Sequence, residues 1–265
     1  MILTKMHECG NDCIMVIYDK NVNYSSLAKK VLDRRIGIGA DALIVVKTKP
    51  LEMIPYNVNG EVLSNYHEGF RCFAKYCYDR NIVKTKFDFI MGFNKIKIEI
   101  INDSPFRCVI DCGQPQFKNN MLYISDIINS FGRVIKVNDA LITTYTINVN
   151  GVNTIVFVDD FKNNILNYAN DISNHKLFNR KTNVTFVKVI DKGRIRIKTY
   201  ENIRGWVLNN DAAVAASVVC ACEAKMVKNF VDVEVEYGTL TVEYKKNIKV
   251  YGTATYVIEC DYKEE

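Results

Sequence analysis

Two long apolar stretches with helical spacing stand out in the pattern of hydrophobic and polar positions. The first runs from Phe70 to Cys77, and the second runs from Ala212 to Cys222 almost without a polar break. A helix that is apolar on all faces has no side to present to water. Each stretch is therefore predicted to be a buried helix in the middle of its own domain.

The lead-in to each predicted helix is similar. Tyr56 to Arg71 and Tyr200 to Ala213 both pass from an aromatic and a polar residue to a glycine, then to Val-Leu and then to an asparagine. Such duplication indicates two similar half-molecules. Helix N-termini carry unpaired N–H groups and partial positive charge, so they are natural anion sites. Two such ends facing one another would define a cleft between the halves.

Strands are predicted around both helices from short β-branched and aromatic runs bounded by turn residues. A polar turn is expected at 7–12, and a helix is expected from Ser25 to Arg35, where apolar residues recur with helical spacing. Residues 114–120 are interpreted as a linker and 159–174 as a helical region. The predicted strands are 2–5, 14–18, 95–101, 106–111, 134–137, 143–149, 154–158, 184–190, 194–199, 231–237, 240–244 and 250–262, with a further buried strand after the glycines at 37 and 39.

The composition allows a large hydrophobic core and indicates which classes of binding partner are not expected. The chain has 265 residues, of which 48% are apolar, and the internal duplication favours two domains. The net charge of +5 is spread along the chain, which is typical of solvated faces and not of a nucleic-acid footprint. No apolar run approaches membrane-spanning length and no secretory leader is recognisable. We expect a cytoplasmic protein without nucleic-acid or membrane partners.

Nine cysteines are present, and several lie inside the two apolar stretches. In a cytosolic protein these are interpreted as buried, reduced thiols. The three histidines, His7, His67 and His175, complete no zinc-binding set with them. We therefore expect neither a metal ion nor a cofactor.

Several motifs occur in a fixed order over the whole chain. They are Lys5-Met6-His7-x-x-Gly10-Asn11-Asp12, Asp33-Arg34-Arg35-x-Gly37-Ile38-Gly39-Ala40-Asp41, Asn57-x-x-Gly60 with Gly69-x-Arg71-Cys72-Phe73-Ala74, Tyr200-Glu201 with Gly205, and Val250-Tyr251-Gly252-Thr253-Ala254 through Cys260. These motifs resemble those of the diaminopimelate epimerase family. The resemblance implies an α+β fold of two pseudo-symmetric domains, each a barrel-like sheet around a central helix, at 1–115 with a returning strand near 252–265, and at 116–251. It also implies a possible homodimer.

The centre of the family's site is altered in this sequence. In the family, two cysteines at the helix N-termini act on opposite faces of a substrate α-carbon, one taking a proton and the other returning one, without a cofactor. Tyr66 stands at the first cysteine position and Asn210 at the second. Because an asparagine amide has no proton to titrate near neutral pH, the two-thiol mechanism is not available.

The turns that hold the substrate carboxylate in the family also differ. Glu68 and Asp211 place carboxylates at the helix N-termini, where they could satisfy the free N–H groups themselves. The family's histidine is missing at 150–153. Its arginine after Glu201 is replaced by Asn202, although Arg204 is close enough in sequence to substitute for it in part.

These residues lead to three hypotheses about the function. The first is an isomerase of altered chemistry, similar to the phenazine-biosynthesis isomerases of the wider superfamily, which move a proton with a carboxylate. It would carry out a proton shift, tautomerisation or elimination on a small amino-acid-derived substrate. His67 or Glu68 would be the base, with Tyr66 or Asp211 as its partner. The second is a non-catalytic binding or scaffold protein, in which His67, Glu68 and Asp211 are helix caps and surface residues and Tyr66 fills the former pocket. The third is an epimerase that recruits another thiol, Cys9, Cys13 or Cys72. The catalytic candidates are Tyr66, His67, Glu68, Asp211 and Glu201, and the substrate-binding candidates are Asn11, Asn57, Asn183, Asn210 and Arg204. Ordinary turn and cap chemistry is the alternative for Asn11, Asn57, Asn183 and Glu201.

Overall fold

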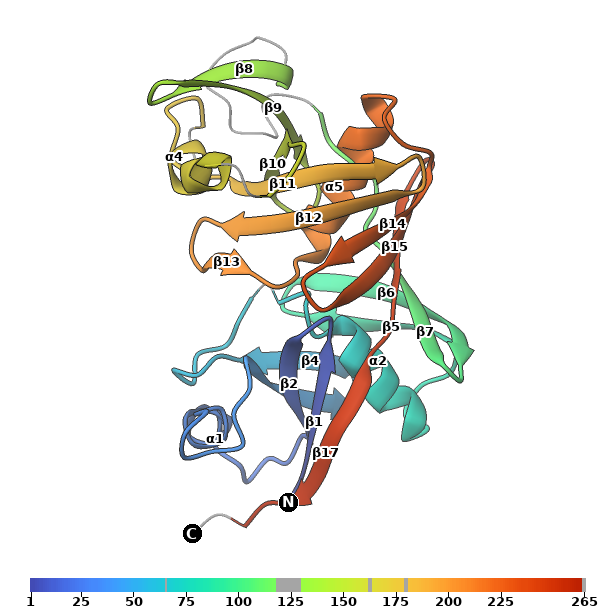
Figure 1. Cartoon of the computed structure of the whole chain (residues 1–265). Helices are drawn as coiled ribbons and strands as arrows, with labels where there is room; N and C mark the ends of the chain where they lie inside the picture. Colours follow the sequence, from blue (N-terminus) through green and yellow to red (C-terminus); the bar gives the residue numbers. More distant parts are fainter. Residues whose placement is uncertain (65, 118–129, 162–163, 179–180, 264–265) are drawn as a thin grey trace. The chain divides into compact units, whose positions relative to one another are not determined.

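The chain folds into two compact units, each with its own core (Figure 1). The computed structural model describes residues 1–64, 66–117, 130–161, 164–178 and 181–263. Unit 1 comprises Met1–Ile110 together with Tyr251–Glu265, and unit 2 comprises Asp111–Val250. Unit 1 is therefore built from both ends of the chain, and unit 2 is one continuous segment.

Unit 1 contains a mixed sheet with two helices. Its sheet pairs the first strand with both the second and the last strand of the chain, in each case antiparallel. The strands are β1 Ile2–Glu8, β2 Asn11–Ile17, β3 Ala42–Thr48, β4 Leu51–Tyr56, β5 Lys86–Met91, β6 Asn94–Asp103, β7 Phe106–Asp111 and β17 Thr255–Asp261, and the helices are α1 Tyr24–Val31 and α2 Phe70–Asp79.

Unit 2 repeats this plan with a longer central helix. Its strands are β8 Phe131–Val137, β9 Ala140–Asn148, β10 Val152–Phe157, β11 Asn183–Asp191, β12 Arg194–Glu201, β13 Gly205–Val207, β14 Phe230–Val235, β15 Gly238–Tyr244 and β16 Ile248–Gly252. Its helices are the 3-10 helix η1 Asn164–Tyr168, α4 Ala169–Ser173 and α5 Asp211–Glu223.

The two units share one order of strand pairings. In unit 1, β2 and β3 are parallel, β3 and β4 antiparallel, β4 and β5 parallel, and β5 and β6 antiparallel. In unit 2, the same sequence of directions runs through β10, β11, β12, β14 and β15. In each unit one long helix, α2 or α5, lies in the sequence between the two strands of the second parallel pair, β4 and β5 or β12 and β14. The predicted α+β fold of two pseudo-symmetric domains is confirmed.

Helix α5 is the core of unit 2. Every residue from Asp211 to Ala221 is buried, and the helix packs against β9, β10, β11, β12, β14 and β15. Its run of alanine and small apolar residues lets the strands approach from all sides, as the absence of a polar face predicts. Although α5 is apolar throughout, no helix in the described part of the chain is long and apolar enough to cross a membrane.

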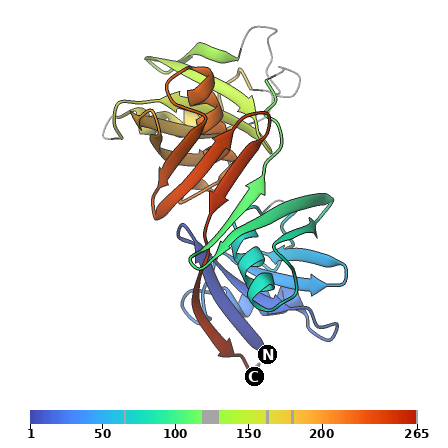
Figure 2. The ribbon, with the colours of Figure 1, turned by 90° about the vertical axis from the view of Figure 1, so that its right-hand side faces the viewer.

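Helix α2 has the equivalent place in unit 1, against β1 and β2 (Figure 2). Phe70 and Phe73 pack around Phe89 of β5, with ring centroids 5.3 Å and 4.6 Å from it. Lys75 of this helix forms an ion pair with Asp79 one turn later. The buried face of α2 holds the N-terminal end of the helix in a fixed position on the sheet.

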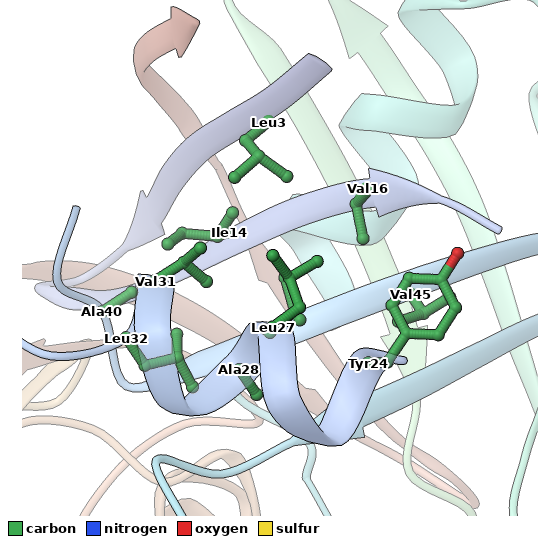
Figure 3. Packing of buried hydrophobic residues seen from close by; sticks show 11 residues of the cluster. Leu3, Ile14, Val16, Tyr24, Leu27, Ala28, Val31, Leu32, Ala40 and Val45 are labelled. Carbon is green, nitrogen blue, oxygen red and sulfur yellow. The ribbon is translucent and has the colours of Figure 1, made fainter. Parts of the chain in front are cut away.

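Helix α1 covers another part of the unit 1 sheet with Tyr24, Leu27, Ala28 and Val31 (Figure 3). The predicted helix from Ser25 to Arg35 is wrong in its length. The helix begins earlier because the side chain of Asn23 accepts a hydrogen bond from the N–H of Ser26 at 3.1 Å. It ends earlier because the carboxylate of Asp33 accepts from the N–H groups of Arg35 and Ile36, at 2.7 and 3.0 Å, and closes a turn.

The turn between β1 and β2 is also shorter than predicted. Only Cys9 and Gly10 form it, with φ angles of 46° and 91°. Two successive positive φ angles are typical of a type I′ hairpin turn, whose twist matches that of the flanking strands. Asn11 and Asp12 consequently belong to β2, opposite Glu8 and His7.

Candidate functional site

Tyr66 lies just before α2, inside unit 1. The residue is only 4% exposed. Its ring lies against Gly69, because a Cβ added to that glycine would come within 3.0 Å of the Cε1 atom of Tyr66. Burial raises the pKa of Tyr66 well above its ordinary value, and its interactions with Cys13 and Glu68 act in the same direction. The phenol is therefore protonated at neutral pH, so it can donate a proton but cannot act as a base.

The next two residues are placed differently. Glu68 is buried, with 5% of its surface exposed. His67 is half-buried, and its ring packs on Phe70 with centroids 5.1 Å apart. The backbone carbonyl of His67 accepts a hydrogen bond from the N–H of Phe70 at 3.1 Å, which forms the turn into the helix. The phenol and one carboxyl thus share the buried environment at the start of α2.

A carboxylate that sequence reasoning missed occupies the N-terminus of α2. Glu8 of β1 accepts hydrogen bonds from the backbone N–H of Arg71 at 3.1 Å and from its Nη1 at 2.9 Å. Neither side chain has any exposed surface. An arginine inside an otherwise apolar helix was the available signal, since a buried guanidinium requires a buried acid. The free N–H groups of α2 therefore receive an acid from a strand remote in sequence.

In unit 2, the corresponding position is occupied by a hydrogen-bonded network around Glu201. Arg204 donates from Nε and Nη2 to the two carboxylate oxygens at 2.6 and 2.7 Å. The Nδ2 atom of Asn210 donates to the same carboxylate at 2.7 Å, while its Oδ1 atom accepts from the N–H of Ala213 at 2.9 Å. Asn210 is thus the N-cap of α5, and both ends of its amide are used. Asp211 is the first residue of the helix and is buried.

The remaining candidates, Asn57, Asn183 and Asn11, lie in separate parts of the chain. Asn57 uses its Oδ1 atom for the N–H groups of Asn59 and Glu61, both at 2.9 Å, and its Nδ2 atom donates to the Glu61 carboxylate. These bonds are those of an ordinary turn. Asn183 accepts from the N–H of Asn202 at 3.4 Å, and Asn11 opens β2. The structure thus brings Glu201, Arg204 and Asn210 together in unit 2, and Tyr66 and Glu68 together in unit 1.

A cluster of charges fixes the loops beside Tyr66. Asp12 forms an ion pair with Lys5 at 3.0 Å and a bidentate ion pair with Arg34. Arg34 also forms an ion pair with Asp41 at 2.8 Å. Burial tends to raise the pKa of Asp12, but the hydrogen bonds from Arg34 and Lys5 outweigh it and the pKa is lowered. Burial and the charge of Asp12 raise the pKa of Asp41. These charged residues belong to the first two family-like motifs, and they hold β2, β3 and the loop after α1 in place.

The thiols nearest to this region have no catalytic environment. Cys13 and Cys72 are buried and hydrogen-bonded to each other. Burial, followed by the interaction with Cys13, raises the pKa of Cys72 well above its ordinary value. A protonated thiol is a poor nucleophile and a poor base. Among the residues that the structure describes, no three histidine, cysteine or acidic side chains are grouped so that they could hold a metal ion.

Comparisons with known proteins agree with this fold. No family model matches the chain. The chain is 30% identical over 259 residues to the diaminopimelate epimerase of Caldanaerobacter subterraneus subsp. tengcongensis, covering 95% of this chain and 94% of the relative. A phenazine biosynthesis protein of the PhzF family from Bacillus anthracis superposes with a TM-score of 0.68 at 13% identity, over 100% and 99% of the two chains. A hydroxyproline epimerase from Agrobacterium vitis with bound trans-4-hydroxy-L-proline gives 0.65 at 10% identity, over 98% and 91%.

Proposed function

Because the chain belongs to the diaminopimelate epimerase family, we propose that it is a cofactor-independent isomerase that shifts a proton on a small amino-acid-derived substrate without inverting a stereocentre. The curated relative and one structural neighbour are named as epimerases, and an epimerase inverts one stereocentre. For an α-amino acid, inversion requires removal and return of the proton on carbon, so we keep proton transfer at carbon and limit it to one face of the substrate.

The state of Asn210 carries this proposal. Inversion requires one group that removes a proton from one face and another that returns a proton to the opposite face. At the second position, the amide of Asn210 has no titratable proton, and its two ends are engaged with Glu201 and Ala213. Without a second titratable group, a carbanion would be reprotonated by the group that formed it or by that group's immediate neighbour, which gives exchange or a shift of the double bond in place of epimerisation.

Unit 1 supplies the proton-transfer groups in this proposal. Tyr66 is the acid, because its raised pKa keeps the phenol protonated. Glu68 is the base, since it is buried and close enough for its charge to raise the pKa of Tyr66. His67 is the other candidate base, and its packing against Phe70 leaves it half-buried. The two bases are distinguished by which substitution abolishes exchange.

The substrate-binding candidates in unit 2 are the residues around Asn210. Glu201 and Arg204 form a bidentate ion pair, and the Glu201 carboxylate also accepts a hydrogen bond from the amide of Asn210. Asp211 remains a candidate partner in proton transfer. The amino-acid character of the substrate is inferred from the relatives, one of which binds trans-4-hydroxy-L-proline.

The test is proton exchange in deuterated water. The protein is incubated with a panel of α-amino acids, including diaminopimelate, and loss of the α-proton is followed by NMR together with the configuration of the product. We expect exchange or isomerisation with retained configuration, lost in Tyr66→Phe and in Glu68→Gln. Glu99→Gln, which alters an exposed ion pair with Lys86 on the surface of unit 1, is the control and should exchange normally. Exchange with inversion would overturn the proposal.

A non-catalytic binding protein is the second candidate, and one observation favours it. The start of α2 is filled by the ring of Tyr66 and the carboxylate of Glu8. Under this alternative, ligands raise the melting temperature while no member of the panel exchanges its α-proton. Glu68→Gln would then leave ligand-induced stabilisation unchanged, because no proton transfer is involved.

A further inference from the structure

A groove lies within unit 2, apart from the residues of the candidate functional site. It has a volume of about 760 Å³ and is bordered by α4 with its preceding 3-10 helix, by β12 and β13, and by the turn between β14 and β15. Figure 1 shows α4 and β13 beside the same end of β12. This volume is within the range of pockets that bind small molecules, roughly 300 to 1,000 Å³.

The groove exists because β12 changes partners along its length. Its pairing with β14 ends at Arg196, and its pairing with β13 begins at Thr199. Ile197 and Lys198 lie between these two pairings, and both border the groove. Side chains alternate along a strand, so Lys198 and Tyr200 are on one face of β12 while Thr199 and Glu201 are on the other. The side chains of Lys198 and Tyr200, which border the groove, therefore lie on the face of β12 opposite to the network of Glu201 and Asn210.

Aromatic rings form one wall. Tyr200 and Trp206 are directly opposite each other in the pairing of β12 with β13, and their rings meet edge to face with centroids 5.6 Å apart. Trp206 is 48% exposed, and Tyr237 on the β14–β15 turn is 65% exposed. The hydroxyl of Tyr200 donates to Oδ1 of Asn170 at 3.2 Å, which fixes the ring against α4. An indole held rigidly and half open to solvent is suited to stacking with a second ring.

Opposite charges lie next to this wall. The Nζ atom of Lys198 is 4.0 Å from the carboxylate of Glu236, and the two side chains are 42% and 52% exposed. At this distance and exposure the pair is loose, so each partner can accept a new counter-ion. An α-amino acid carries an ammonium and a carboxylate on one carbon, and these two charges match a lysine and a glutamate placed side by side. The Nδ2 group of Asn170, on the same groove, offers an additional donor to the ligand carboxylate.

We propose that this groove binds a free aromatic α-amino acid, with its ring on Trp206 and Tyr200, its carboxylate at Lys198 and its ammonium at Glu236. The site is separate from the candidate active site and does not depend on the proposed isomerase activity. A binding site of this kind would make the protein responsive to an amino acid other than the one it converts.

The chain contains a single tryptophan, so its fluorescence reports on this groove alone. The probe is L-phenylalanine, which does not emit where indole does. We expect a saturable change in the emission of Trp206. 3-Phenylpropionate lacks the ammonium, phenethylamine lacks the carboxylate and L-leucine lacks the ring, and each should bind about tenfold or more weakly, a difference that corresponds to one lost interaction.

Variants of the full chain locate the ligand. Lys198→Met and Glu236→Gln should each weaken phenylalanine binding about tenfold, as expected for a lost charge partner. The matched control is Lys245→Met, which removes a different exposed ion pair of unit 2, with Glu243 at 2.5 Å, and should leave binding unchanged. Trp206→Ala, measured by calorimetry, should abolish binding.

Three results would overturn this proposal. The first is the absence of a saturable signal by both fluorescence and calorimetry. The second is equal binding of all four probes, which would indicate non-specific apolar contact. The third is binding that is lost in Tyr66→Phe but retained in Lys198→Met, since the ligand would then occupy the candidate active site of unit 1. Failure of the proton-exchange experiment leaves these outcomes unaffected, so the two proposals are tested separately.

Discussion

The carboxylate of Glu8 lies 2.9 Å from the guanidinium of Arg71, and neither side chain has any surface exposed to solvent. The same carboxylate accepts the backbone N–H of Arg71 in the first turn of α2. It therefore neutralises a buried cation and satisfies a helix N-terminus at once. The start of α2 carries its own anion, supplied from β1.

Replacing Glu8 should strongly destabilise unit 1. Glu8→Gln leaves the guanidinium of Arg71 buried without its acid, which costs about 3 to 5 kcal/mol in comparable buried pairs. Denaturant unfolding followed by circular dichroism measures the change. The control is Glu99→Gln at the exposed pair with Lys86, where a loss of about 0 to 1 kcal/mol is expected. Equal losses in the two variants would show that burial does not determine the strength of the Glu8 pair.

The two roles of Asn210 can be separated by two substitutions. Asn210→Ser keeps an N-cap acceptor and loses only the donor to Glu201, whereas Asn210→Ala loses both. We expect Asn210→Ala to be less stable than Asn210→Ser by about 1 kcal/mol, the usual contribution of an N-cap. Unfolding monitored by Trp206 fluorescence reports on unit 2. If the two variants unfold at the same denaturant concentration, the side-chain cap does not stabilise α5.

The pH dependence of proton exchange tests the role of Tyr66. Because burial raises its pKa above the ordinary value of 10.0, the phenol stays protonated through neutral and mildly alkaline pH. The exchange rate should therefore show no alkaline decline from this group below about pH 10. Tyr66→Phe should lower the rate by about 10²- to 10⁴-fold, as expected for loss of a general acid. A decline near pH 8 in the unaltered protein would assign the acid to another group.

Gly69 tests how closely Tyr66 and the sheet pack against the start of α2. A Cβ at this position would lie 2.4 Å from Cδ1 of Ile44 and 3.0 Å from Cε1 of Tyr66. Gly69→Ala should destabilise unit 1 by about 1 to 3 kcal/mol through overpacking. Ile44→Val removes the nearer atom, so the double variant should be more stable than the sum of the two single changes predicts. Strict additivity in thermal unfolding would mean that Ile44 does not limit the space.

His175 should make unit 2 less stable in weak acid. Burial lowers the pKa of His175 below its ordinary value of 6.5, and the charges of Lys176 and Arg133 act in the same direction. Its Nδ1 atom accepts from the N–H of Leu177 at 3.2 Å, which requires the neutral ring. As pH falls below 6.5, His175 is protonated in the unfolded chain but stays neutral in the folded chain. The free energy of unfolding therefore decreases.

The measurement is unfolding of His175→Gln and of the unaltered protein at about pH 7.5 and about pH 5, on either side of the ordinary histidine pKa. The substitution should reduce the difference in stability between the two pH values. An unchanged difference would assign the acid sensitivity of unit 2 to other groups.

The sequence was sufficient for the parts of the fold that depend on local pattern. The uniformly apolar run of α5 predicted its burial, and the repeated lead-ins predicted two similar domains. The ends of α1 were wrong because they depend on single side-chain hydrogen bonds of Asn23 and Asp33. The turn between β1 and β2 was overestimated because polar residues in 7–12 belong to the strands.

In the candidate site, too, contacts between residues close in sequence were predictable, and contacts between distant residues were not. Glu201, Arg204 and Asn210 lie within ten positions of the chain, so a sequence reading could group them. The acid at the start of α2 was assigned from sequence to the adjacent Glu68, while Glu8, 63 residues from Arg71, makes the contact with the helix N–H. Partners at that separation are set by how β1 and α2 pack, which local pattern does not encode.

The pairing of β1 with β17 has a consequence for synthesis on the ribosome. Thr4 and Glu259, which are hydrogen-bonded in this pair, are 255 residues apart, and the whole of unit 2 is translated between them. In the order of synthesis, unit 1 is therefore interrupted by the whole of unit 2, and its sheet remains one strand short until β17 leaves the exit tunnel. During that interval the open edge of β1 is the surface of the nascent chain most in need of protection by a chaperone.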